Sequence, residues 1–170
     1  MLYCIENNNY KMVRGQNIMR FTLWFICFFV ASNALAQSTN SDWAQLEAET
    51  LEHYRALLQF DTSDPPGREL PAAEYLRDVL ASEGIDVEML ATDPARPNVL
   101  ARINGNGKKQ PLLLMAHTDV VNVDPEKWTF PPFSATVDGG YVYGRGAVDD
   151  KDNLASALMV MLELKLLQKI

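Results

Sequence analysis

Residues 111–119 read Pro-Leu-Leu-Leu-Met-Ala-His-Thr-Asp, and this stretch decides the predicted fold. Residues 111–116 form a short, continuous apolar run, which is typical of a β-strand buried on both faces. In open α/β sheets, ligands bind at the carboxyl ends of the strands. His117 and Asp119 follow the run directly, so they are placed where a functional site is expected.

Helical and strand patterns alternate around this run, which predicts an α/β fold with a mixed, mostly parallel sheet flanked by helices. Paired prolines at 65 and 66 predict a loop, and Asp138-Gly139-Gly140 predicts a hairpin turn. The expected helices are 42–60, 71–83 and a last one capped by Asp152 or Asn153 and running to the chain end. The expected strands are 85–89, 98–104, 111–116, 134–137 and 141–143.

Three features of these elements sharpen the expectation. Asp42 and Gln45 resemble a capping box at the start of the first helix. Pro71 suits the first turn of the second helix, and Gly84 suits its C-terminal cap. The last helix is apolar nearly all round over residues 154–162, so it is expected to be sandwiched in the core.

The 170 residues are enough for one domain with a hydrophobic core, and the formal net charge is −7 with a sequence pI of about 4.8. An acidic surface repels phosphate backbones, and no Lys/Arg cluster reverses this, so no nucleic-acid partner is expected.

The first 36 residues resemble a secretory signal peptide. Basic residues precede an apolar run at 21–31, and small residues precede a cleavage point after Ala36. Cleavage would leave residues 37–170 as an exported, periplasmic or secreted chain, which is expected to have no stable membrane anchor. The alternative is an uncleaved anchor or an interfacial helix. Met19, directly before Arg20, is a better candidate for the initiator methionine, in which case residues 1–18 would not be translated.

Both cysteines, Cys4 and Cys27, lie in this leader, so the mature chain is expected to have no disulfide and no thiolate chemistry.

His117 and Asp119 are two residues apart, as in a metal-ligating histidine whose second ring nitrogen is held by a carboxylate. The plain alternative is a histidine that hydrogen-bonds a loop beside an aspartate that caps a turn. The other histidine, His53, lies beside the apolar stripe of the first helix and is interpreted as a surface or half-buried residue.

A second cluster, Gly144-Arg145-Gly146-Ala147-Val148-Asp149-Asp150-Lys151, follows a strand and opens a helix. Its adjacent aspartates offer hard oxygen ligands for a divalent cation. Alternatively, one of them only satisfies amide groups at the helix start. Phosphate-loop, dinucleotide, EF-hand and serine-hydrolase motifs are all lacking. One histidine and one carboxylate do not complete a zinc site, which takes about three protein ligands.

Three ordered segments resemble the M20 metallopeptidases, a family that includes glutamate carboxypeptidase, succinyl-diaminopimelate desuccinylase, aminoacylase-1 and carnosine dipeptidases. The loop Phe60-Asp61-Thr62-Ser63-Asp64-Pro65-Pro66-Gly67 also looks like the first loop of that family. The resemblance implies an incomplete catalytic domain of the di-zinc aminopeptidase-like fold. The segments are His117-Thr118-Asp119-Val120-Val121, Trp128-Thr129-Phe130-Pro131-Pro132-Phe133 and residues 143–151.

The resemblance also implies roles for individual residues. His117 would bind one zinc, Asp119 would orient it and support catalysis, and Asp149 would bridge two zincs, with Asp150 the second choice for that ligand. Asp152 stands where the family usually has glycine. The implied cofactor is Zn²⁺, two per site, with Co²⁺ or Mn²⁺ as alternatives.

By resemblance, the parent protein is a hydrolase of amide or peptide bonds: a carboxypeptidase, a dipeptidase or an N-acyl amino acid deacylase. Its substrate would be a peptide or an N-acyl amino acid. The family's Glu-Glu pair, later ligands and lid or dimerisation domain do not occur in the 170 residues, so this chain is expected to be an inactive fragment. The resemblance is compatible with a homodimeric parent. The alternative is a non-catalytic secreted metal-binding module.

Overall fold

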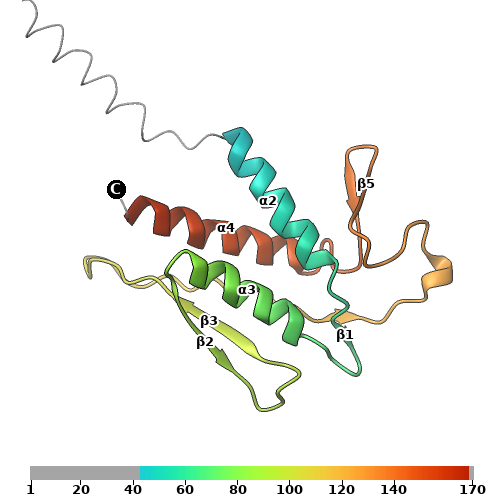
Figure 1. Cartoon of the computed structure of the whole chain (residues 1–170), viewed down its shortest axis with the longest axis horizontal. Helices are drawn as coiled ribbons and strands as arrows, with labels where there is room; N and C mark the ends of the chain where they lie inside the picture. Colours follow the sequence, from blue (N-terminus) through green and yellow to red (C-terminus); the bar gives the residue numbers. More distant parts are fainter. Residues whose placement is uncertain (1–42, 169–170) are drawn as a thin grey trace, which may run out of the picture. The chain divides into compact units, whose positions relative to one another are not determined.

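The structure is a computed structural model that describes residues 43–168 (Figure 1). The predicted signal peptide and the predicted cap Asp42 lie outside the described residues and stay predictions. Among the described helices, none combines the length and apolar character needed to cross a bilayer. The elements in chain order are α2 (Trp43–Leu58), β1 (Ser63–Asp64), α3 (Leu70–Ser82), β2 (Asp86–Leu90), β3 (Asn98–Arg102), β4 (Val120–Val121), η2 (Pro125–Lys127), β5 (Thr136–Asp138), β6 (Tyr141–Tyr143) and α4 (Lys151–Gln168).

The first two predicted helices are confirmed as α2 and α3, each within two residues of its expected end. Pro71 lies in the first turn of α3, where a missing N–H leaves no helical bond unmade. Gly84 adopts a φ of +72°, and its N–H donates to Ala81 O at 2.9 Å. This left-handed residue ends the helix as the sequence predicted.

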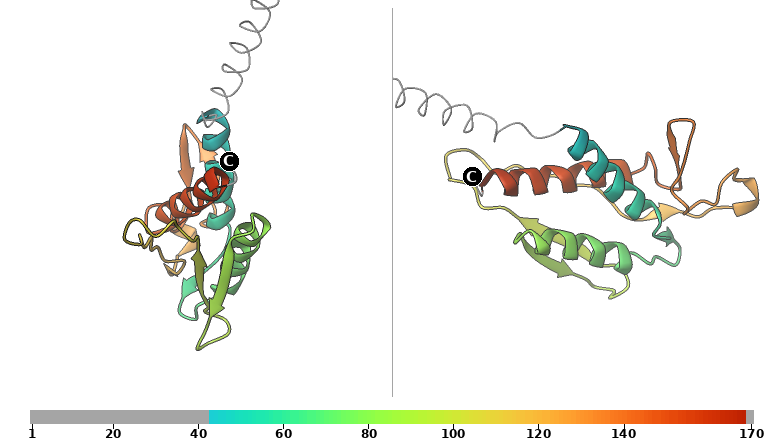
Figure 2. Two further views of the ribbon diagram at one scale, coloured as in Figure 1. Left: turned by 90° about the vertical axis from the view of Figure 1, so that its left-hand side faces the viewer. Right: turned by 45° about the horizontal axis from the view of Figure 1, so that its top comes forward.

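The strands β2 and β3 form an antiparallel pair that runs in register from Asp86 opposite Arg102 to Leu90 opposite Asn98. Exposed and half-buried residues alternate along both strands, so the hairpin has one solvent-exposed face and one face toward α3. Figures 1 and 2 show α3 lying along this hairpin. The expected alternation of 85–89 is therefore confirmed.

Two further pairs complete the strands of the described residues. The hairpin of β5 and β6 turns at Gly139 and Gly140, which have φ values of +56° and +84°, as the Asp-Gly-Gly signal predicts. The strands β1 and β4 pair in parallel, so the predicted loop 61–67 contains a two-residue strand. The mixed α/β class is confirmed, with one parallel and two antiparallel pairs in residues 43–168.

The predicted buried strand at 111–116 is wrong for the structure described. Residues 111–119 form no strand, and four large apolar side chains are exposed: Leu112 (80%), Leu113 (71%), Leu114 (39%) and Met115 (79%). A strand exists only through hydrogen bonds to a neighbouring strand, and residues 43–168 place no such neighbour beside this segment. The apolar run signals a need for burial without specifying what provides it.

The last helix, α4, begins at Lys151, so Asp152 and Asn153 lie within its first turn and neither caps it as predicted. Nor is the helix sandwiched in the core. Both α2 and α3 contact α4 (Figure 1), and the buried residues of α4 fall on one stripe: Lys151, Ala155, Leu158, Met159 and Leu162. Its other face leaves Val160, Leu164, Leu166 and Leu167 between 43% and 57% exposed, since no described element covers that side. The core cluster consists of Leu57, Leu76, Leu80, Ile85, Ala155, Leu158, Met159 and Leu162.

Candidate metal centre

His117 lies on an extended segment three residues before β4, facing the turn that leads into α4. Its backbone N–H donates to Asp150 Oδ2 at 3.2 Å. This bond ties the segment to the start of α4, across 33 positions of sequence. The side chain of His117 is 47% exposed, so it is accessible to a ligand.

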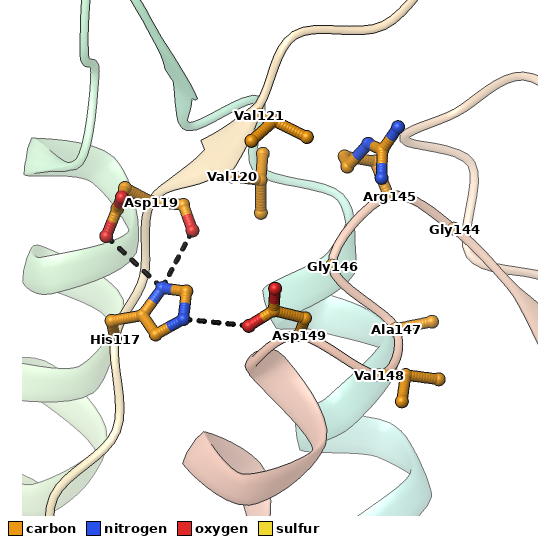
Figure 3. A pocket seen from close by; sticks show the side chains of 10 residues that line it. All are labelled: His117, Asp119, Val120, Val121, Gly144, Arg145, Gly146, Ala147, Val148 and Asp149. Carbon is orange, nitrogen blue, oxygen red and sulfur yellow. Dashed lines mark hydrogen bonds and ion pairs between the residues drawn. The ribbon is translucent and has the colours of Figure 1, made fainter.

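The two ring nitrogens of His117 face different aspartates (Figure 3). Nδ1 lies 3.0 Å from the backbone oxygen of Asp119 and 3.2 Å from its Oδ1. Nε2 lies 3.0 Å from Oδ1 of Asp149. With a proton on Nδ1 donated to Asp119, Nε2 and the Asp149 oxygen are two acceptors in contact. Two acceptors at this distance call for a proton or a cation between them.

The pKa of His117 reflects this arrangement. Burial alone would lower it, but hydrogen bonds to Asp149 and to the backbone of Asp119, with the charges of Asp119 and Asp150, raise the pKa above its usual value. A cation at Nε2 must displace the proton that these acidic groups stabilise, so its affinity should rise with pH.

The turn from Gly144 to Asp150 brings Asp149 to His117. Gly146 has a φ of +83°, and a Cβ atom there would lie 2.7 Å from Val120 Cγ1. Only glycine fits this close approach to β4. The Lys151 N–H donates to Gly146 O at 3.0 Å, which closes the turn at the first residue of α4.

Asp149 and Asp150, joined by a cis peptide bond, have different environments. Oδ1 of Asp150 accepts from the Asn153 side chain and Oδ2 from the His117 N–H. The bond from Asn153, followed by that from His117, holds the pKa of Asp150 below its usual value. The side chain of Asp149 is 90% exposed and meets His117 Nε2. Both oxygens of Asp150 are therefore engaged, whereas Asp149 presents a carboxylate to solvent.

We expect Asp150→Ala to lower the free energy of unfolding by about 1 kcal/mol, because it removes acceptors at the start of α4. Asp149→Ala should change that free energy by no more than about 0.5 kcal/mol. Urea unfolding followed by circular dichroism measures both variants in metal-free buffer. An equal loss of stability in the two variants would mean that Asp149 is held for structure and not left free for a ligand.

His117, Asp119 and Asp149 line a pocket of about 210 Å³ together with Val120, Val121 and the turn residues 144–148 (Figure 3). An imidazole nitrogen and a carboxylate oxygen that converge on one point suit Zn²⁺. Residues 43–168 place no group of three or more His, Cys, Asp or Glu side chains where they could hold a metal ion together. The donor types therefore fit zinc, and the described residues supply two donors of the usual three.

The predicted role of His53 is confirmed, since its side chain is 14% exposed and its Nδ1 contacts Tyr75 Oη at 2.6 Å, away from the pocket. Sequence reasoning missed the residues that brace the site. The Tyr54 hydroxyl donates to Ala147 O at 2.7 Å, and the Lys151 ammonium donates to Phe60 O at 2.8 Å. These bonds span more than 90 positions, so no local pattern signals them.

The chain is similar to a family of known proteins. Residues 113–169 match the model of peptidase family M20/M25/M40. The chain is 38% identical over 120 residues to the N-formyl-4-amino-5-aminomethyl-2-methylpyrimidine deformylase of Halalkalibacterium halodurans, covering 68% of the chain and 28% of that protein. It is 44% identical over 100 residues to the succinyl-diaminopimelate desuccinylase of Pseudoalteromonas atlantica, covering 58% of the chain and 24% of that protein.

Among solved structures, the M20 family metallo-carboxypeptidase Sso-CP2 from Sulfolobus solfataricus superimposes with a TM-score of 0.60 at 34% identity, over 68% of the chain and 27% of that structure. The chain thus spans about a quarter of the length of the proteins it matches. By motif, relatives and fold, it belongs to the M20 peptidase family of hydrolases and has part of that family's catalytic-domain fold.

Proposed function

We propose that this chain contributes to the zinc-binding active site of an amide-bond hydrolase, with His117 and Asp149 as metal ligands. The observation that carries the proposal is the approach of His117 Nε2 to Asp149 Oδ1 at 3.0 Å, with Asp119 on the opposite ring nitrogen. A carboxylate on the far nitrogen fixes the tautomer of a metal-ligating histidine and raises its basicity.

The names of the relatives support a substrate class. A deformylase and a desuccinylase each remove an acyl group, and a carboxypeptidase removes a terminal residue. A peptide or an N-acyl compound is therefore the proposed substrate of the parent protein, and carboxypeptidase, dipeptidase and deacylase activities all fit this class.

Each residue of the site has a distinct task in this proposal. Asp119 holds a proton at Nδ1 of His117, which directs the lone pair of Nε2 into the pocket. Asp149 adds a negative oxygen on the same side, and its exposure leaves room for a second cation and a substrate. A bound zinc polarises a carbonyl oxygen and makes a water molecule more acidic.

The acidic side chains that line the pocket are Asp119 and Asp149. Asp119 is engaged with His117, and Asp149 is the proposed ligand, so neither is free to take a proton from water. With two donors and no free general base among the described residues, we expect the chain by itself to bind zinc weakly and to hydrolyse no N-acyl amino acid or dipeptide at a measurable rate.

The chain contains two histidines, which allows one titration to test the site and its control together. Zinc added to the untagged chain is expected to shift the NMR signals of the His117 ring and leave those of His53 unchanged. Asp149→Ala should abolish the response of His117. A response that survives Asp149→Ala, or the absence of any response, would contradict the proposed ligand pair.

The same samples test whether this part of the site is insufficient alone. Tight binding of two zinc ions, or turnover of an N-acyl amino acid that His117→Ala abolishes, would show that the chain needs no further ligand or base.

A further inference from the structure

Thr62 is a fully buried threonine that contacts the backbone on both sides of Asp119. Its side chain has 0% exposure, and its hydroxyl donates to Thr118 O at 2.6 Å. Its own carbonyl accepts the N–H of Val120 at 3.1 Å. One residue of the first loop therefore holds both peptide units that flank Asp119, across 56 positions of sequence.

The hydrogen bond from the Val120 N–H to Thr62 O affects the site directly. In a trans peptide unit, the C=O and the N–H point in opposite directions. The Val120 N–H points at Thr62, so the carbonyl of Asp119, in the same unit, points away from Thr62. This carbonyl lies 3.0 Å from Nδ1 of His117. The position of Thr62 thus sets the direction of the acceptor that His117 meets.

The hydrogen bond from the Thr62 hydroxyl to Thr118 O makes this positioning of Asp119 depend on the threonine side chain. The strands β1 and β4 pair over two residues only, Ser63 with Val120 and Asp64 with Val121. So short a ladder leaves the backbone free to shift, and the buried hydroxyl adds a bond one step beyond it. Without the hydroxyl, the Thr118 carbonyl loses its donor in a partly buried place, which is unfavourable.

Thr62 is itself anchored from the other side of β1. Arg96 makes ion pairs with Asp64 and Glu69, both at 3.0 Å, and the Glu69 side chain is only 6% exposed. A Cβ atom on Gly67 would lie 2.6 Å from Nε of Arg96, so the loop closes tightly around this guanidinium. The loop is therefore a firm support on which Thr62 can hold Asp119.

We propose that Thr62 is a positioning residue of the metal centre: through its hydroxyl and carbonyl it orients Asp119 so that His117 keeps its proton on Nδ1 and presents Nε2 to the metal. The proposal rests on the proposed function only in the identity of Nε2 as a metal ligand. The hydroxyl-dependent choice of tautomer is a property of the metal-free chain.

Thr62→Val removes the hydroxyl at nearly constant volume, and Thr62→Ser keeps it. Nitrogen-15 NMR of the two histidine rings at pH 9, in metal-free full chains that carry Asp149→Ala, reports the tautomer of each, because this substitution removes the carboxylate that competes for the proton at Nε2. We expect His117 to carry its proton on Nδ1 when residue 62 is threonine or serine, and to lose this preference in Thr62→Val. His53, held by Tyr75, should be unaffected in all three proteins.

Zinc titration of the Thr62 variants with Asp149 intact gives a second readout. The affinity of the site at His117 should fall roughly 10-fold in Thr62→Val and recover in Thr62→Ser, as is usual when the support of a metal-ligating histidine is lost. A Thr62→Val protein that folds and keeps both the Nδ1 tautomer and the wild-type affinity would overturn the proposal.

The chain with native Thr62 keeps the proposal testable if Thr62→Val does not fold, because a proton on Nε2 of His117 in the metal-free Asp149→Ala chain would also overturn it. Failure of the proposed function has a different signature. In that case zinc leaves the His117 ring signals of the wild type unchanged, while the contrast in tautomer between the valine and serine variants persists.

Discussion

Leu57→Ala is expected to lower the free energy of unfolding by about 3 to 5 kcal/mol, at the upper end of the range for buried leucines. The side chain of Leu57 is completely buried near the end of α2. It belongs to the cluster in which α2, α3 and α4 meet, with Leu76, Leu80 and Leu158 among its members. Truncation removes apolar contacts within this cluster, and a close-packed interior cannot fully collapse around the gap.

Leu51→Ala is the matched control, because Leu51 lies on the same helix and is 40% exposed. That variant should lose less than about 1 kcal/mol, since little apolar surface is uncovered. Urea unfolding followed by circular dichroism gives both values. If Leu57→Ala shows no cooperative transition, its loss of stability exceeds the total free energy of unfolding of the wild type. Equal effects of the two substitutions would mean that the three helices do not share one core in solution.

The elements that the sequence predicted well are those set by local signals. Pro71 and Gly84 mark the two ends of α3 because each acts on the backbone within one turn of the helix. Gly139 and Gly140 likewise set the β5–β6 turn through their own φ angles. Such signals need no knowledge of what lies across the fold, so they can be read from the chain alone.

Two of the wrong predictions concern burial, which depends on a partner. The apolar run at 111–116 and the all-round apolar surface of α4 both indicate that something should cover them. Neither pattern names the covering element. The described residues cover α4 on one face and leave the apolar side chains at 112–115 between 39% and 80% exposed. The pattern of apolar residues indicates that a segment has to be covered, but which element covers it depends on the whole fold.

The residues of the candidate site also fall into those that the sequence predicts and those that it does not. His117, Asp119 and Asp149 were named from short motifs, and the structure brings all three together in one pocket. The sequence assigns no role to Thr62 or Lys151, because their bonds to Thr118 and Phe60 join segments far apart in sequence. The residues expected to do chemistry carry a recognisable type and spacing, while the residues that hold them do not.

Lys151 supplies the second large expected effect, a dependence of stability on pH. Its side chain is 1% exposed, and its ammonium donates to Phe60 O at 2.8 Å. Burial lowers the pKa of Lys151 from 10.5 to about 8, while the negative charge of Asp61 opposes this shift. The folded chain therefore binds this proton more weakly than the unfolded chain does.

This difference in proton affinity between the folded and unfolded chains sets the direction in which stability changes with pH. Below pH 8 both states carry the proton, and the folded state bears the full unfavourable effect of a buried charge. Between pH 8 and pH 10.5 the folded state releases the proton first, so stability rises with pH. A shift of this size corresponds to about 3 kcal/mol over the whole window, of which roughly 2 to 3 kcal/mol is reached by pH 10.

Lys151→Met removes the ammonium at similar length, and Lys109→Met does so at an exposed position. Urea unfolding of the metal-free chains at pH 7 and pH 10 separates this group from other titrations. The stability of the wild type relative to Lys151→Met should increase by roughly 2 to 3 kcal/mol between the two pH values, whereas relative to Lys109→Met it should stay constant within about 0.5 kcal/mol. A constant difference for both variants would mean that Lys151 keeps an ordinary affinity for its proton in the folded chain, and that water reaches the end of its side chain.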